Sequence, residues 1–303
     1  MSDEGSNSRV NRWAEQWIRH PQLAYQAMLY TAGIVFTLTM LFPFYWLFVL
    51  ALTPGELLHT VGLVPEGFNL AVFIEIFQRL PLHRYIFNSF FLATTTTIIV
   101  LVLASIAGYV FGRLDFPGRR PLMLFVLAIS YFPPAAFLLP LFELFTGNVE
   151  FFGVSSPVLF NTPGAMILPF SALFLPLAIF ILTVFYAQIP DGLEDAARIE
   201  GTTRLGALYR IIIPLSAPGV ATAGILTFIA IYNEFFFGFI MNDGQAENWA
   251  PLVWGILGYQ GQYTEFYNLM AAASIVGVLP VVVLVIFAQE QIVSGLTTGG
   301  LKE

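Results

Sequence analysis

Long apolar stretches alternate with shorter polar segments along almost the whole chain. A helix needs about 20 residues to cross the hydrocarbon core of a bilayer, and six stretches are long enough to do so. They lie at residues 24–50, 86–111, 121–145, 165–187, 220–241 and 269–292. The pattern predicts an all-α, multi-pass protein of the plasma or inner membrane with six transmembrane helices.

The positions of the cations predict the orientation of these spans. Cytoplasmic connections of membrane proteins carry an excess of Arg and Lys. On one side of the six-span arrangement, Arg79 and Arg84 are the only Arg or Lys residues in the connections. The other side carries Arg9, Arg12, Arg19, Arg113, Arg119, Arg120, Arg198, Arg204, Arg210 and Lys302. Both termini are therefore expected in the cytoplasm.

The chain is expected to divide into three parts. Residues 1–23 form a cytoplasmic tail in which apolar residues at helical spacing predict an amphipathic helix on the membrane surface. Those residues are Val10, Trp13, Trp17 and Ile18. Residues 24–295 form the six-span domain, which contains a long cytoplasmic connection at 189–218. Residues 296–303 form a second cytoplasmic tail.

The composition agrees with a surface that faces lipid, and it excludes several functions. Of the 303 residues, 57% are hydrophobic and 10% charged, whereas soluble domains carry about a quarter charged residues. The net charge of −7 argues against nucleic-acid binding. The only Lys is Lys302, near the end of the chain. Because a phosphate-binding P-loop needs a Lys after its glycines, any ATP hydrolysis must belong to another chain.

A membrane enzyme is the main alternative, and the residue inventory argues against it. An intramembrane metalloprotease needs His ligands in its helices, but His20, His59 and His83 fall outside the predicted spans. A Ser–Lys dyad within the membrane would need a Lys other than Lys302. The chain also has no Cys. We therefore expect no catalytic residues and no metal ligands.

The cytoplasmic connection at 189–218 carries local helix signals. Asp191 followed by Glu194 predicts a capping box at a helix N-terminus. Residues 193–200 then read as two helical turns, and Gly201 is suited to end them because it tolerates positive φ. A second short helix is predicted at 203–212, ending before Pro214.

A helix of eight residues is too short to be stable alone in water, so it must dock on something. Ala196, Ala197 and Gly201 are small enough to let another surface approach. The three- and four-residue spacing places Glu194, Ala197 and Gly201 on one face. Two interpretations remain open: the helix fills a groove in a partner protein, or it rests on the spans of its own chain.

This connection resembles the EAA loop of ABC-importer permeases. The loop's pattern of Glu, two Ala and a later Gly, followed by Ile and a Pro-containing end, is matched here with one residue inserted. The matching residues are Glu194, Ala196, Ala197, Gly201, Ile211, Pro214 and Leu215.

The resemblance extends along most of the chain and is to the carbohydrate branch, typified by the second permease of maltose transporters. It includes Asn88-Ser89, Gly108-Tyr109, the segment 113–120, Tyr232-Asn233-Glu234-Phe235 and the tail 295–302. The chain is thus similar to a permease subunit that forms half of the translocation path for a sugar or oligosaccharide by alternating access.

The resemblance also implies partners and a coupling site. A second permease subunit, two ATP-binding subunits and an extracytoplasmic substrate-binding protein are expected, besides membrane lipid. ATP and Mg would sit on the partner ATPase subunits, and this chain would bind no cofactor. The residues expected to contact the ATPase are Glu194, Ala196, Ala197, Arg198 and Gly201.

Polar and aromatic residues inside the spans are candidates for the substrate path, because burying a polar group in lipid without a partner is unfavourable. The candidates are Tyr232, Asn233, Glu234, Phe236 and Phe132. Amide and carboxylate groups beside aromatic rings suit a polyhydroxyl ligand. Asn233 and Glu234 could instead bond across the helix bundle, and Phe132-Pro133-Pro134 is expected to kink span three.

Other cargoes and energy sources remain as alternatives. The solute could be a polyol, glycerol phosphate or another polar molecule. The chain could also be an ion-coupled secondary transporter, with Glu234 as the proton or ion carrier. Dependence on a copurifying ATPase, rather than on an ion gradient, separates these classes.

Overall fold

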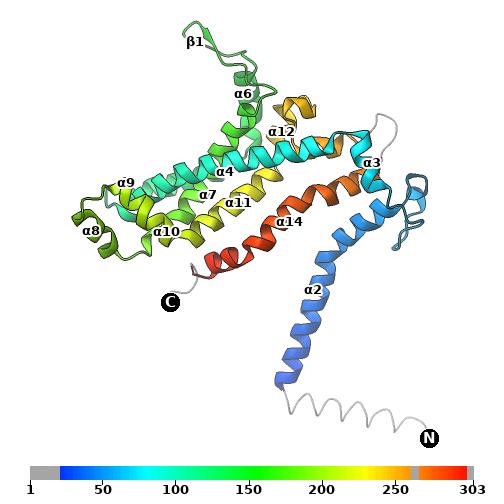
Figure 1. Cartoon of the computed structure of the whole chain (residues 1–303), viewed down its shortest axis with the longest axis horizontal. Helices are drawn as coiled ribbons and strands as arrows, with labels where there is room; N and C mark the ends of the chain where they lie inside the picture. Colours follow the sequence, from blue (N-terminus) through cyan, green and yellow to red (C-terminus); the bar gives the residue numbers. More distant parts are fainter. Residues whose placement is uncertain (1–20, 261–265, 299–303) are drawn as a thin grey trace. The chain divides into compact units, whose positions relative to one another are not determined.

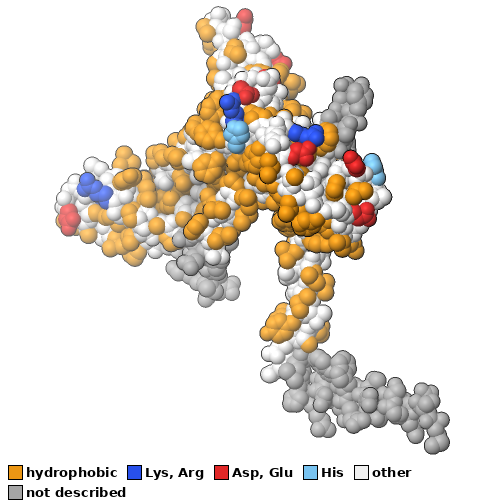
Figure 2. All heavy atoms as spheres, turned by 45° about the vertical axis from the view of Figure 1, so that its right-hand side comes forward, with side chains coloured by type: hydrophobic (Ala, Val, Ile, Leu, Met, Phe, Trp, Pro, Cys, Tyr) orange, Lys and Arg blue, Asp and Glu red, His pale blue; other side chains and the backbone are white. Residues whose placement is uncertain are grey.

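The computed structural model describes residues 21–260 and 266–298. The predicted surface helix within residues 1–20 and the last five residues lie outside this part. Contacts divide the chain into two compact units, residues 1–69 and 70–303. In the space-filling view, hydrophobic side chains cover most of the visible face and the few charged ones form small groups (Figure 2).

The first unit contains one long apolar helix, α2 (Pro21–Leu52), followed by the short 3-10 helix η1 (Gly55–Thr60). Most side chains of α2 are exposed, as expected for a helix that faces lipid or another subunit. The segment after η1 folds back on the end of α2. The Tyr45 hydroxyl donates to the Leu63 carbonyl, and the Asn69 amide donates to the Leu52 carbonyl at 2.9 Å.

The centre of the second unit is a bundle of long helices that lie side by side (Figure 1). They are α4 (Leu82–Arg113), α7 (Gly164–Ala187), α11 (Ala217–Tyr232) and α14 (Tyr267–Thr298). At Gly108 an added Cβ would lie 3.0 Å from the Leu182 Cβ, and at Gly112 it would lie 3.0 Å from the Thr183 carbonyl oxygen. Small residues therefore let α4 and α7 approach closely.

Span three is broken where the sequence predicts a kink. Helix α5 (Arg119–Ser130) and helix α6 (Ala135–Phe145) meet at an angle of 83°. Pro133 and Pro134 lie between them, and proline removes the backbone donor that a continuous helix needs. A short antiparallel hairpin follows, with β1 (Glu150–Phe151) paired to β2 (Val154–Ser155). The predicted kink is confirmed.

Span five is also interrupted, which the sequence did not predict. Helix α11 ends at Tyr232, and the short helix α12 (Phe236–Ile240) begins after a break. The outer connections of the second unit contain three further short helices. These are α3 (Val72–Arg79), η3 (Ala246–Asn248) and α13 (Leu252–Leu257).

The connection between α7 and α11 forms a compact helical segment at one end of the bundle (Figure 1). It consists of α8 (Asp191–Ile199), α9 (Arg204–Ala207), the π-helical turn η2 (Leu208–Ile212) and α10 (Ile213–Leu215). The second short helix was predicted at 203–212, and η2 does end at Ile212, where the three-residue helix α10 follows at once. Pro214 lies in the first turn of α10, where a helix does not use the missing amide.

Within the described residues, five helical segments are long and apolar enough to cross a membrane when α11 and α12 are counted together as Ala217–Ile240, and there are six when the bent pair α5–α6 is counted as one span. These spans coincide with the six predicted stretches. The predicted all-α, six-span fold is confirmed, and residues 189–218 contain the predicted short helices between spans four and five. The predicted division into tails and membrane domain at residues 23 and 295 stays a prediction. Both boundaries lie within helices, since α2 is Pro21–Leu52 and α14 is Tyr267–Thr298.

Candidate functional site

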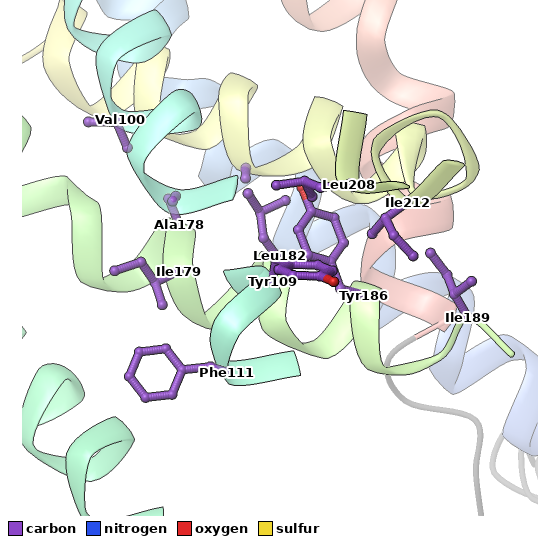
Figure 3. Close-up of a cluster of buried hydrophobic side chains, with 12 residues drawn as sticks. Val100, Tyr109, Phe111, Ala178, Ile179, Leu182, Tyr186, Ile189, Leu208 and Ile212 are labelled. Atoms are coloured by element: carbon purple, nitrogen blue, oxygen red, sulfur yellow. The ribbon is translucent and has the colours of Figure 1, made fainter. Parts of the chain in front are cut away.

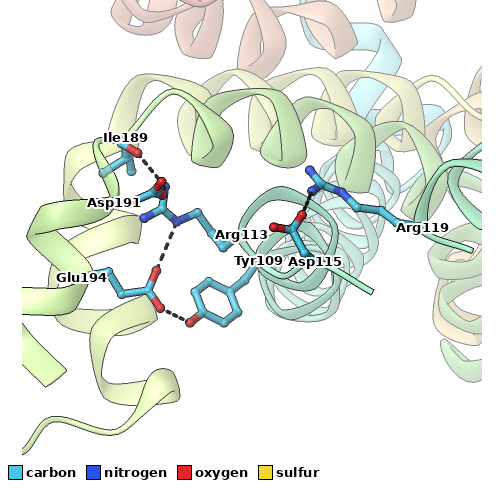
Figure 4. Close-up of polar contacts among 7 residues, drawn as sticks. All are labelled: Tyr109, Arg113, Asp115, Arg119, Ile189, Asp191 and Glu194. Atoms are coloured by element: carbon cyan, nitrogen blue, oxygen red, sulfur yellow. Dashed lines mark hydrogen bonds and ion pairs between the residues drawn. The ribbon is translucent and has the colours of Figure 1, made fainter. Parts of the chain in front are cut away.

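The cytoplasmic helix α8 is attached to the end of α4 by a group of polar contacts (Figure 4). The Arg113 guanidinium lies 3.1 Å from the Glu194 carboxylate through Nε and 2.9 Å from the Asp191 carboxylate through Nη1. Its Nη1 also donates to the Ile189 carbonyl at 2.5 Å. The Tyr109 hydroxyl donates to the other oxygen of Glu194. We call Tyr109, Arg113 and Glu194 the α4–α8 clamp.

The clamp replaces the capping box that the sequence predicts, so that prediction was wrong. Pro190 occupies the N-cap position, and among the described residues no side chain caps this helix. Asp191 and Glu194 turn instead toward Arg113. A guanidinium presents several donors in a fixed fork, which suits two carboxylates and a carbonyl at once.

Burial separates the two carboxylates of α8. The side chains of Arg113 and Glu194 are 4% and 9% exposed, whereas that of Asp191 is 90% exposed. An exposed ion pair contributes little to stability. A buried charge left without its partner is strongly destabilising. Glu194 is therefore the carboxylate that joins α8 to α4, and Asp191 is an accessory.

The residues predicted to contact an ATPase divide into a buried pair and three exposed residues. Glu194 and Ala197 do share a face, but that face is buried against the same chain. Ala196, Arg198 and Gly201 are exposed. The interpretation that the helix rests on its own spans therefore holds for the Glu194–Ala197 face, while the opposite face is open.

The open face of α8 is partly apolar. It includes Leu193, Ala196 and Ile199, and Ile199 is 88% exposed. Leu193 and Ala196 are three residues apart, as are Ala196 and Ile199, so they are neighbours on the helix surface. A water-facing helix that presents Ile and Leu in this way has a surface suited to a protein partner.

Gly201 ends α8 as the sequence predicts. Its φ is +90°, which other residues adopt only with strain. The Gly201 amide donates to the Arg198 carbonyl and the Thr202 amide to the Ala197 carbonyl, both at 3.0 Å. These two bonds form a Schellman motif. Thr203 then caps α9 by accepting from the Gly206 amide at 3.1 Å, so the α8–α9 turn is fixed by local bonds.

The clamp also adjoins an apolar core (Figure 3). Tyr109 belongs to a buried cluster with Leu182 and Tyr186 of α7. Ile189, just before α8, and Ile212, in the turn η2, are in the same cluster. The residues on both sides of α8 are therefore packed against α4 and α7.

The predicted path residues are placed in different environments. Tyr232 is 2% exposed, and its hydroxyl donates to the Gly277 carbonyl of α14 at 2.7 Å. It therefore acts as a packing residue between α11 and α14. Asn233 and Phe236 are exposed. Phe132, at the break of span three, is 50% exposed, with its ring centroid 4.9 Å from that of Phe137.

Glu234 holds the break in span five. Its carboxylate accepts from the Phe236 amide at 2.8 Å and from the Phe237 amide at 3.2 Å. Free amides at a helix N-terminus favour a carboxylate, which explains why the chain can bend here inside a span. The alternative that Glu234 bonds across the bundle is not observed, since its hydrogen-bond partners Phe236 and Phe237 are on its own segment.

On the outer side, Asp243 connects two loops. It accepts from Asn248 Nδ2 at 2.8 Å and from Asn161 Nδ2 at 3.0 Å, and the Gln245 amide donates to its other oxygen at 3.0 Å. Partial desolvation acts to raise the pKa of this carboxyl, but the hydrogen bonds outweigh it and hold the pKa below its usual value. The Asn161–Asp243 contact joins the loop before α7 to the loop after α12.

Asn88 and Ser89, quoted above for their resemblance, anchor the same outer loop. Asn88 Nδ2 donates to the carbonyls of Ala246 and Ala250 at 2.8 and 3.0 Å. The Leu252 amide donates to the Ser89 hydroxyl oxygen at 2.7 Å. Their role is to bind the start of α4 to the outer loop.

Sequence reasoning assigned no role to Tyr109 and Arg113. The available signal was their four-residue spacing at the cytoplasmic end of span two, which puts both on one helix face. A carboxylate-bearing loop on the same side of the membrane was the natural partner. Arg113 and Glu194 are 81 positions apart in the sequence, so only the fold shows that they pair.

The long apolar helices define the chain as a multi-pass membrane protein. Residues 101–297 match the family described as the binding-protein-dependent transport system inner membrane component, and the chain belongs to that family. The predicted resemblance is confirmed. Members are permease subunits of ABC transport systems, so the chain is a non-catalytic membrane component.

Several relatives are similar over most of their length. The sulfoquinovosyl glycerol transport permease SmoH of Agrobacterium fabrum is 36% identical, with 90% of this chain and 93% of SmoH covered. The trehalose transport permease SugB of Mycobacterium tuberculosis is 35% identical, with 86% and 92% covered. The trehalose/maltose permease MalG of Thermococcus litoralis is 32% identical, with 91% and 96% covered.

The fold is also that of a solved transporter. A bacterial ABC transporter that imports the acidic polysaccharide alginate superposes with a TM-score of 0.64 at 17% identity, covering 89% of this chain and 97% of that one. The same type of transporter, in complex with a periplasmic protein bound to an alginate pentasaccharide, gives a TM-score of 0.65 at 18% identity, covering 90% and 95%. At this identity the comparison supports the fold alone.

Proposed function

We propose that this chain forms half of the translocation path of an ATP-driven importer for a sugar or oligosaccharide. The observation that carries the proposal is the agreement among the relatives' names. The matched permeases serve trehalose, maltose, arabinooligosaccharides and sulfoquinovosyl glycerol, all of which contain sugar rings. Several of these relatives are more than 30% identical along nearly the whole chain.

The proposed assembly contains four kinds of component. A second permease subunit completes the path, two ATPase subunits bind ATP and Mg, and an extracytoplasmic binding protein delivers the solute. The family's description as binding-protein-dependent supports the last of these. The near absence of Lys from this chain supports ATP hydrolysis on separate subunits. The chain itself needs no cofactor in this scheme.

The proposed docking surface on the ATPase side is the open face of α8, formed by Leu193, Ala196 and Ile199. Exposed apolar side chains on a fixed helix can fill a groove without first having to become ordered. Arg198 lines a polar pocket with Arg113 and Glu194 instead, and Gly201 lies just after the end of α8. Glu194 and Ala197, which the sequence analysis also placed in the contact, support α8 from the buried side.

The proposed path lining contains three of the five predicted residues. Asn233, Phe236 and Phe132 are the exposed members of the predicted set. An amide can hydrogen-bond a sugar hydroxyl while aromatic rings pack on the apolar faces of the sugar. The Tyr232 hydroxyl bonds to α14 and the Glu234 carboxylate caps the start of α12, so the proposal gives the path first to the three exposed residues.

The proposal is tested by uptake measurements on the assembled transporter. The chain and its partner subunits are reconstituted in proteoliposomes, and labelled trehalose, maltose, glycerol phosphate and a polyol are compared. We expect uptake of a sugar that requires ATP and the binding protein. Uptake of only a polyol or glycerol phosphate would overturn the sugar assignment. Uptake driven by an ion gradient without ATP would overturn the importer assignment.

A further inference from the structure

The α4–α8 clamp has the geometry of a connection that transmits movement. Tyr109 and Arg113 lie one turn apart on α4 and hold the two oxygens of one carboxylate, Glu194 (Figure 4). Arg113 also holds the Ile189 carbonyl before α8. The helix is thus held at its first turn and just ahead of it, and both attachments end on the same stretch of α4.

The two charged side chains of the clamp have little exposed surface, so separating them is unfavourable. The Arg113 and Glu194 side chains are almost completely buried. If α8 moved away from α4 without carrying it along, each would keep a charge with no partner in a poorly hydrated site. A displacement of α8 therefore moves the end of α4 as well.

Helix α4 can pass such a displacement into the membrane. It is 32 residues long, and its glycines Gly108 and Gly112 pack directly against α7. Its other end is tied to the outer loop through Asn88 and Ser89. The clamp thus connects the cytoplasmic helix α8 to a span whose far end holds the extracytoplasmic loops.

We propose that Tyr109 and Arg113 are positioning residues of the transport cycle, which tie α8 to span α4 so that ATP-driven movement of α8 reaches the translocation path. This inference rests on the proposed docking of α8 on an ATPase. Neither residue contacts ATP or solute in this scheme. Their effect is exerted through Glu194.

A merely stabilising clamp would affect how much transporter assembles, but not how many solute molecules each ATP moves. The test therefore measures both quantities in purified complex. We expect Arg113→Gln and Tyr109→Phe to copurify with the ATPase and to hydrolyse ATP. For Arg113→Gln the number of solute molecules moved per ATP should fall by about tenfold or more, since a buried charge loses its partner. Tyr109→Phe, which leaves the ion pair, should show a smaller fall.

Two exposed ion-pair variants serve as matched controls. Asp191→Asn removes the exposed acceptor of the same Arg113. Arg119→Gln removes an exposed partner of Asp115, 3.1 Å away on the same cytoplasmic side. Both should keep the wild-type ratio. An unchanged ratio in Arg113→Gln, or an equal fall in the controls, would overturn the inference.

A cross-linking variant keeps the test decisive if Arg113→Gln fails to assemble. Because the chain contains no Cys, the double variant Arg113→Cys with Glu194→Cys offers one reactive pair. We expect poor coupling before treatment and restored coupling after a short thiol cross-linker joins α4 to α8. Loss of transport on cross-linking would show that the two helices must separate. Failure of wild type to bind any ATPase would instead overturn the proposed function.

Discussion

The Tyr109 hydroxyl donates a hydrogen bond to the Glu194 carboxylate, joining a transmembrane helix to a cytoplasmic helix 85 residues later in the chain. Arg113 neutralises the same carboxylate from the next turn of α4. A short helix that could not persist alone in water is thereby fixed at its first turn. Its opposite face stays available to a partner.

Removing the Glu194 carboxylate should destabilise the transporter. In Glu194→Ala the buried Arg113 guanidinium loses its principal partner, and a loss of about 3–5 kcal/mol is expected. Asp191→Asn should cost less than about 1 kcal/mol, since Asp191 is exposed. Thermal unfolding of the purified complex measures both. Equal effects of the two substitutions would contradict the role given to burial.

Gly201→Ala should destabilise the end of α8. A residue with a Cβ at φ +90° is strained, at a cost of about 1–2 kcal/mol. Gly192→Ala is the matched control, because Gly192 lies inside α8 with open space around it. Alanine there should be neutral or stabilising by up to about 1 kcal/mol. Unfolding curves in which both substitutions behave alike would be inconsistent with the Schellman ending.

Ile199→Asp should abolish association with the ATPase while leaving the chain in the membrane. A carboxylate placed in an apolar groove loses its hydration without gaining a partner. Ile74→Asp is the control, since Ile74 is also exposed but lies in the outer helix α3. Copurification of the ATPase with each variant is the measurement. Retention of the ATPase by Ile199→Asp would exclude Ile199 from the contact.

The folding stability of the outer loops should depend on pH because of Asp243. Its pKa is lower in the folded protein than in the unfolded chain, so ionisation stabilises the fold. That stabilisation is fully present above the ordinary Asp pKa of about 4, and it is lost as pH falls through the lowered value. Unfolding temperatures of wild type and Asp243→Asn should therefore converge at low pH. A constant difference between them at all pH values would contradict this sign.

Features that depend on local sequence could be predicted, and those that depend on distant partners could not. Hydropathy predicted the six spans. Pro133 and Pro134 predicted the break in span three, and Gly201 predicted the end of α8. Each of these signals depends only on neighbouring residues in the sequence. The capping box at Asp191 and Glu194 was wrong since both side chains bond to Arg113, far away in sequence. The break in span five was missed because Glu234 was considered only as a path or bundle residue, and not as one that caps the helix after it.

The candidate site also could be predicted only in its local features. Helical spacing correctly put Glu194 and Ala197 on one face, but spacing says nothing about what that face meets. The fold turns it toward α4, which leaves Ile199 as the most exposed large apolar residue of α8. The same limit applies to Tyr232, whose polar neighbours suggested a path although its hydroxyl bonds to α14.

The most direct test of the account is the accessibility of residue 199 in the assembled transporter. The chain has no Cys, so Ile199→Cys offers a single thiol to a water-soluble maleimide, applied to the complex before and after the ATPase subunits are stripped away. The account predicts protection of the thiol in the complex and rapid labelling once the ATPase is removed. Equally rapid labelling in both preparations would contradict the claim that α8 is seated in an ATPase.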